Sequence, residues 1–63
     1  MPIVRIEMYE GRTLAQKAEL ARTITDAIVR IAKTTPEETS IVFYDVAKEK
    51  VAKGGILVSE KTK

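Results

Sequence analysis

Two strand-like segments flank one long helical segment in this chain, and that order restricts the folds available to it. Residues Pro2–Tyr9 alternate between apolar and other side chains, as a half-buried strand does. Apolar residues recur at helical spacing from Thr13 to about Lys33, and Ser40–Val46 is almost continuously apolar. Because a helix of about 20 residues is long enough to be a crossover, we predict parallel strands with a right-handed connection.

Local signals mark the ends of the helix and the turn that follows it. Thr13 with Gln16 three residues later is a capping-box pattern. Thr35, Pro36 and Glu38 predict a single turn that is capped by the Thr35 side chain. The helix face that we expect to be buried consists of Leu20, Ile24, Ala27, Ile28 and Ile31.

The C-terminal part of the chain has a different pattern. Gly54 and Gly55 lie between short apolar stretches and predict a small hairpin within Glu49–Val58. The residues Ser59–Lys63 are polar and indicate an irregular end. The expected fold class is therefore α+β: a β-α-β unit with one long helix and a C-terminal hairpin.

The small size of the chain limits the core that it can build. We expect residues 1–63 to form one domain, and a domain of this length buries only about 60% of its unfolded surface. The chain has no cysteine and no histidine, which excludes disulfides, thiolate metal sites and the commonest metal ligand. Oligomerisation is the remaining way to gain stability, and extension of the two-stranded sheet into a four-stranded dimer would supply the missing core.

The charge pattern argues against large anionic partners. Eleven basic and nine acidic residues are interspersed and give a net charge of +2, so we expect no nucleic-acid binding. No apolar run has the length of a membrane span, and the chain opens with a strand pattern and not with a signal peptide. We therefore expect no membrane association and a cytoplasmic location.

Pro2 is the strongest candidate for chemistry. Removal of Met1 would convert its nitrogen into a free secondary amine. An α-amine titrates near 8, and an apolar pocket disfavours the cation and lowers the pKa toward neutrality. Pro2 would then act as a general base without a side chain. Alternatively, Pro2 simply begins a strand, where its missing N–H costs little.

Several segments together resemble the 4-oxalocrotonate tautomerase family of the tautomerase superfamily. The residues that carry the resemblance are Pro2-Ile3, Glu10-Gly11-Arg12-Thr13, Gln16-Lys17, Ala47-Lys48 and Gly54-Gly55. Each segment is unspecific alone, but their combination in a chain of this length is fairly specific. The resemblance extends over essentially the whole chain.

The resemblance implies a fold, an assembly and a reaction. It implies β-α-β subunits that pair into dimers, with three dimers forming a hexamer. It also implies that the Pro2 amine moves a proton along a small anionic 2-hydroxy-dienoate or 2-oxo acid, such as 2-hydroxymuconate from aromatic catabolism, with no metal or organic cofactor. Arg12 matches the carboxylate-binding arginine, which often acts on the site of a neighbouring subunit.

The chain departs from the family pattern at two substrate-binding positions. The best-studied members have a second arginine early in the second strand, where an ungapped match places Ser40 and a match shifted by two residues places Val42. They also have an aromatic residue shortly before the glycine pair, where this chain has Val51. Phe43 and Tyr44 are alternative pocket walls, although core packing suits each of them better.

These departures leave several interpretations open. One interpretation is a tautomerase for a different or smaller substrate, with weaker activity on muconates. The alternative is a catalytically weak or structural subunit of a mixed hexamer whose partner supplies the missing arginine. The superfamily also includes dehalogenases, which need an acidic residue to activate water. Glu10 and Asp45 are candidates for that residue only by elimination. A small binding module unrelated to tautomerases is a further interpretation.

Overall fold

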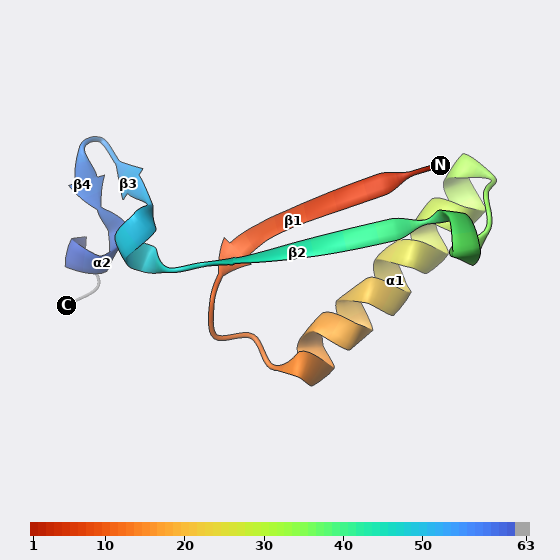
Figure 1. The fold of residues 1–63 in the computed structure, drawn as a ribbon, viewed down its shortest axis with the longest axis horizontal. Coiled ribbons are helices and arrows are strands. Elements are labelled where there is room, and N and C mark those ends of the chain that lie inside the picture. Colours follow the sequence, from red (N-terminus) through yellow and green to blue (C-terminus); the bar gives the residue numbers. More distant parts are fainter. Residues whose placement is uncertain (62–63) are drawn as a thin grey trace.

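The computed structural model describes residues 1–61 and shows a β-α-β unit followed by a small hairpin (Figure 1). Strand β1 precedes a long helix, α1, and strand β2 follows it. The hairpin β3–β4 and a four-residue helix, α2, complete the chain. The bounds are β1 Ile3–Tyr9, α1 Leu14–Ala32, β2 Ser40–Val46, β3 Ala52–Lys53, β4 Ile56–Leu57 and α2 Val58–Lys61.

Strands β1 and β2 are parallel, as the sequence predicts. Their register runs from Ile3 opposite Ser40 to Tyr9 opposite Val46. A further backbone hydrogen bond extends the pairing at the N-terminal end of both strands, where the Ser40 N–H donates to the Pro2 carbonyl at 3.0 Å. Because side chains alternate between faces, one face of the sheet packs against α1 and the other is open.

The predicted capping box starts α1. The Thr13 hydroxyl accepts from the Gln16 N–H at 3.1 Å, and the Gln16 side chain accepts from the Thr13 N–H at 2.9 Å. The helix ends at Lys33, whose φ of 59° and ψ of 53° are left-handed, while the Thr34 N–H donates to the Val29 carbonyl at 3.3 Å. This pattern of backbone bonds is a common way to satisfy the last carbonyls of a helix.

A 3₁₀ turn over Pro36–Glu38 connects α1 to β2, with Pro36 at its first position as predicted. The predicted side-chain cap is wrong, because the Thr35 side chain makes no capping hydrogen bond. The Thr39 hydroxyl instead donates to the Thr35 carbonyl at 3.0 Å. The turn is thus closed from its C-terminal side.

The predicted hairpin is present between Ala52 and Leu57. Strands β3 and β4 are antiparallel, and Gly54 and Gly55 both have positive φ, 59° and 81°. Two successive positive φ values suit a tight hairpin turn and favour glycine. The predicted irregular end is wrong for residues 59–61, which belong to α2. The rest of that prediction concerns residues 62–63, which lie outside the described residues.

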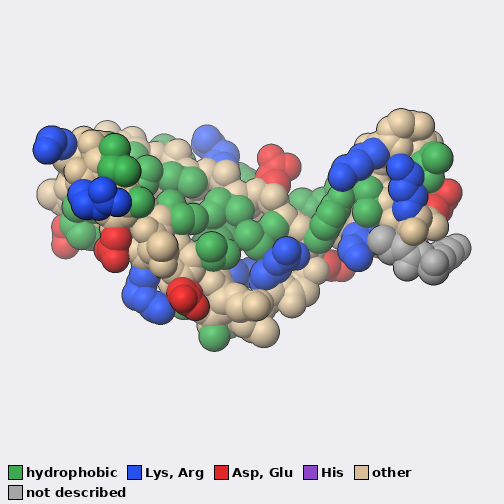
Figure 2. Space-filling model, turned by 180° about the vertical axis from the view of Figure 1, so that it is seen from behind, with side chains coloured by type: hydrophobic (Ala, Val, Ile, Leu, Met, Phe, Trp, Pro, Cys, Tyr) green, Lys and Arg blue, Asp and Glu red, His purple; other side chains and the backbone are tan. Residues whose placement is uncertain are grey.

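A single copy of the chain leaves much apolar surface open. In residues 1–61, Val58 is the one apolar side chain that is almost fully buried, at 8% exposure. Four residues of the predicted helix face are half-buried, but Ile31 is 69% exposed, so the prediction for Ile31 is wrong for the isolated chain. Figure 2 shows hydrophobic side chains in a band along the sheet region. Other large apolar side chains that are exposed are Leu14, Ile3, Val42, Tyr44, Ile56 and Leu57.

No helix within residues 1–61 combines the length and the apolar character needed to cross a membrane.

Candidate functional site

Pro2 and Ser40 lie together at the N-terminal end of the two parallel strands. Pro2 is half-buried, and its carbonyl accepts the hydrogen bond from the Ser40 backbone. The same register places Ser40 directly opposite Ile3. Two of the residues assigned to the site from the sequence are therefore neighbours, although 38 positions separate them in the chain.

Arg12 and Val51 lie together at the other end of the sheet. Arg12 follows Gly11, whose φ of 121° is a conformation that favours glycine. The Arg12 guanidinium donates from Nη1 to the Tyr9 carbonyl at 3.0 Å. A cavity of about 250 Å³ joins this arginine to Val51, and it is lined by Glu7, Met8, Tyr9, Arg12, Val46 and Val51.

The whole length of β1 separates the pair Pro2 and Ser40 from the pair Arg12 and Val51. Seven residues of extended strand at about 3.3 Å per residue put roughly 20 Å between Pro2 and the start of the turn that carries Arg12. Figure 1 shows the same separation, with the N-terminus at one end of β1 and the turn into α1 at the other. One copy of the chain therefore does not bring Pro2 and Arg12 to the same substrate.

An ion pair fixes the segment that follows Arg12. Lys17, in the first turns of α1, pairs through Nζ with Oδ2 of Asp45 near the end of β2. The Glu10 N–H also donates to the Val46 carbonyl at 3.1 Å. The turn between β1 and α1 is thus attached to β2 on both sides of Arg12.

The two acidic residues considered for water activation do not line the cavity of Arg12 and Val51. Asp45 is engaged with Lys17. Glu10 lines a separate cavity of about 340 Å³ with Ala47, Lys48, Glu49 and Ser59. The structure therefore adds nothing in favour of a dehalogenase.

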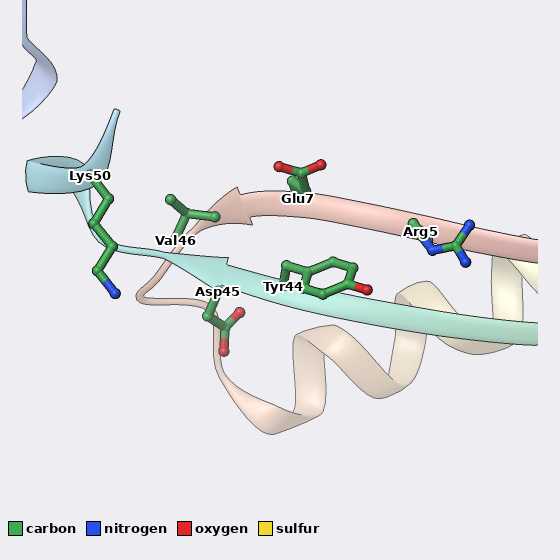
Figure 3. Close-up of a pocket in the computed structure, with 6 residues that line it drawn as sticks. All are labelled: Arg5, Glu7, Tyr44, Asp45, Val46 and Lys50. Carbon is green, nitrogen blue, oxygen red and sulfur yellow. The ribbon is translucent and has the colours of Figure 1, made fainter. Parts of the chain in front are cut away.

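A larger cavity, of about 470 Å³, lies along the sheet, and Pro2, Arg12, Ser40 and Val51 are not among its lining residues. Figure 3 shows side chains from both strands around it, with Arg5 toward one end and Lys50 toward the other. Tyr44 lines this cavity and not the one with Arg12, whereas Phe43 is half-buried on the face that packs against α1. The lining residues are Arg5, Glu7, Tyr44, Asp45, Val46 and Lys50.

Reasoning from the sequence missed Tyr9 as a residue of the Arg12 cavity. Tyr9 lines the cavity, its carbonyl accepts a hydrogen bond from Arg12, and Lys48 Nζ lies 6.0 Å from the centre of its ring. The available signal was its position as the last residue of the strand, three residues before Arg12. A side chain at that place shares the turn with the arginine.

Comparison with known proteins decides the family. The family model described as tautomerase enzyme matches residues 2–61. The chain belongs to the tautomerase family. A probable tautomerase of Lactococcus lactis is 34% identical over 61 residues, which cover 97% of this chain and all of that protein.

Solved structures of tautomerases have the same fold. A heterohexameric 4-oxalocrotonate tautomerase from Chloroflexus aurantiacus is 35% identical, with a TM-score of 0.86 over 95% of this chain and 97% of that one. A 4-oxalocrotonate tautomerase isozyme from Methylibium petroleiphilum is 28% identical, with a TM-score of 0.91 over 97% of this chain and 95% of that one. Family membership and these neighbours support an isomerase activity of the tautomerase type.

Proposed function

We propose that this tautomerase catalyses keto-enol proton transfer on a small 2-hydroxy-dienoate or 2-oxo acid, with the Pro2 amine as the base and acid. In the proposed reaction the neutral amine takes the proton from the 2-hydroxyl group. The electrons of the dienol move into a carbonyl at C2, and the ammonium returns a proton to a carbon of the former diene. No proton is gained or lost overall, so the step is an isomerisation.

The proposal requires that Pro2 be the first residue of the mature chain. With Met1 attached, the Pro2 nitrogen is a tertiary amide and has no useful basicity. A small second residue such as Pro2 permits removal of the initiator methionine. A base works best with a pKa near ambient pH, and an apolar site would lower the pKa of this amine in that direction.

The other proposed site residues bind the substrate. Arg12 would hold a carboxylate, because a guanidinium offers two parallel hydrogen bonds to it. Ser40, beside Pro2, would place a hydroxyl near the oxygen on C2, and Val51 would exclude water from the pocket. No organic or metal cofactor is required by this chemistry.

The observation that carries the proposal is the grouping of these residues at the two ends of the sheet. Pro2 lies beside Ser40 at one end, and Arg12 shares a cavity with Val51 at the other; in the proposal each pair supplies one half of the site. We propose that the halves meet between different copies of the chain, in a homohexamer built as a trimer of dimers. The exposed apolar side chains of the single copy support such an assembly.

The direct test combines intact mass with an ultraviolet assay of 2-hydroxymuconate ketonisation. A chain without Met1 that converts the substrate would support the proposal. A processed chain would contradict the proposal if it forms a hexamer but converts neither 2-hydroxymuconate, a dianion, nor 2-hydroxy-2,4-pentadienoate, a monoanion. We propose a cytoplasmic site of action, and a step of aromatic catabolism is the proposed context for the dianion.

Ser40 favours a second candidate function. Its backbone bonds to Pro2, and its side chain is neutral where an ungapped match to the family pattern has a cation, so a partner chain could be needed to supply that charge. The heterohexamer from Chloroflexus aurantiacus shows that a tautomerase neighbour of this chain assembles from unlike subunits. Under this alternative the chain is a catalytically weak or structural subunit of a mixed hexamer, and the purified chain alone would form no active oligomer.

A further inference from the structure

Tyr9 combines three relationships at the end of β1. It is half-buried and pairs with Val46 of β2. It lines the cavity of about 250 Å³ that also contains Arg12 and Val51. Its ring is the aromatic surface among the residues that line this cavity, since the others are Glu7, Met8, Arg12, Val46 and Val51.

Two cationic side chains lie near Tyr9. Arg12 Nη1 donates to its carbonyl, and Lys48 Nζ is 6.0 Å from its ring centre. The second distance is at the outer limit of a cation–π contact, and Lys48 itself lines the separate cavity that contains Glu10, so Arg12 is the cation of the Tyr9 cavity. The bond to Arg12 uses the Tyr9 backbone, and replacement of the Tyr9 side chain therefore leaves the acceptor for Arg12 in place.

A conjugated carboxylate matches these surroundings. Its carboxylate requires a cation, and its flat chain of double bonds stacks on an aromatic ring better than on an aliphatic side chain. We propose that Tyr9 is a substrate-contacting residue whose ring forms the wall against the conjugated chain of a dienoate held by Arg12. This inference rests on the proposed function and adds to it the residue that selects for a flat, conjugated substrate.

The test is calorimetric binding of sorbate, a dienoate monoanion that lacks the 2-hydroxyl group and so binds without reacting. We expect Tyr9→Leu to weaken sorbate binding about 3- to 10-fold, the range expected for loss of an aromatic contact, and Tyr9→Phe to stay within about 2-fold. Tyr44→Leu is the matched control, because Tyr44 lines a different cavity. We expect it to bind sorbate as the unmodified chain does.

A rescue experiment separates contact with the ligand from a merely structural role. Val51 lines the same cavity, so Val51→Phe supplies a second aromatic ring there. In the Tyr9→Leu background, Val51→Phe should restore sorbate binding to within about 2-fold of the unmodified chain. A loss that Val51→Phe does not reverse would assign Tyr9 to folding and overturn its role as a wall.

Two further results would also overturn the inference: sorbate binding that Tyr9→Leu does not change, and no sorbate binding by the processed, assembled chain. Binding needs no proton transfer, so the outcome is separate from that of the proposed function. If the chain binds sorbate through Tyr9 but isomerises no 2-hydroxy-dienoate, the result would support this site and contradict the proposed activity. An active chain whose KM is unchanged by Tyr9→Leu would retain the activity and contradict this site.

Discussion

Pro2 and Arg12 lie at opposite ends of β1, with about 20 Å of strand between them. Each has a neighbour from the second half of the chain: Ser40 donates to the Pro2 carbonyl, and Val51 shares a cavity with Arg12. A parallel sheet of two strands necessarily keeps its two ends apart. A site that uses both residues therefore needs two copies of the chain.

The first prediction concerns the Pro2 amine. In protein whose intact mass shows removal of Met1, Pro2→Ala should lower kcat/KM for tautomerisation at least about 100-fold, because a positioned proton carrier contributes at this level. The ultraviolet ketonisation assay measures the loss. Turnover unchanged from that of the parent protein would remove Pro2 from the mechanism.

Arg12 is predicted to stabilise the negative charge that develops on the substrate in the transition state. Arg12→Ala should weaken transition-state stabilisation by about 2–4 kcal/mol, measured as the ratio of kcat/KM values. Arg22→Ala is the matched control, because Arg22 is an exposed arginine on α1. An Arg12→Ala effect below about 0.5 kcal/mol, similar to that of the control, would make Arg12 an ordinary surface residue.

The ion pair between Lys17 and Asp45 joins α1 to the end of β2, and its contribution to stability should be small. Their side chains are 22% and 40% exposed, so solvent screening keeps the coupling near about 0.5 kcal/mol. A double-mutant cycle with Lys17→Met and Asp45→Asn, followed by urea unfolding at one protein concentration, measures it. A coupling free energy above about 2 kcal/mol would contradict this estimate.

Much of the local structure can be predicted from the sequence because it depends on neighbouring residues. The capping box of Thr13 and Gln16 and the hairpin at Gly54 and Gly55 follow from side chains and backbone freedom within a few positions. The parallel pairing follows from the length of the helix. The Thr35 side-chain cap was predicted wrongly, because the Glu38 N–H that the Thr35 hydroxyl would cap donates to the Thr35 backbone carbonyl instead.

The features that the sequence did not predict depend on three-dimensional contacts, which a sequence pattern does not contain. The contact between Arg12 and the Tyr9 carbonyl depends on the path of the turn at Gly11, and so the sequence did not reveal Tyr9 as a cavity residue. Ile31 fits the helix face by spacing, yet its side chain is 69% exposed in a single copy. Whether another copy covers Ile31 is a property of the assembly.

The end of α1 gives a prediction about stability. Lys33 has a left-handed backbone, with φ of 59° and ψ of 53°, a conformation that costs a residue with a side chain about 1 kcal/mol relative to glycine. Lys33→Gly should therefore stabilise the protein by about 0.5–1 kcal/mol, despite the greater freedom of glycine in the unfolded chain. Thermal unfolding checks this against Lys53→Gly, a strand substitution expected to destabilise. A lower unfolding temperature for Lys33→Gly would contradict it.

The most direct test of a site shared between copies is complementation between two inactive variants. Pro2→Ala and Arg12→Ala chains carrying different tags are co-expressed, and assemblies that contain both chains are purified with the two tags. If each site takes Pro2 from one copy and Arg12 from another, random mixing leaves about a quarter of the sites with both residues intact. We therefore expect about a quarter of the parent activity, from two variants that are each nearly inactive. Mixed assemblies no more active than either variant alone would show that the two residues do not meet between copies, and would contradict the proposed site.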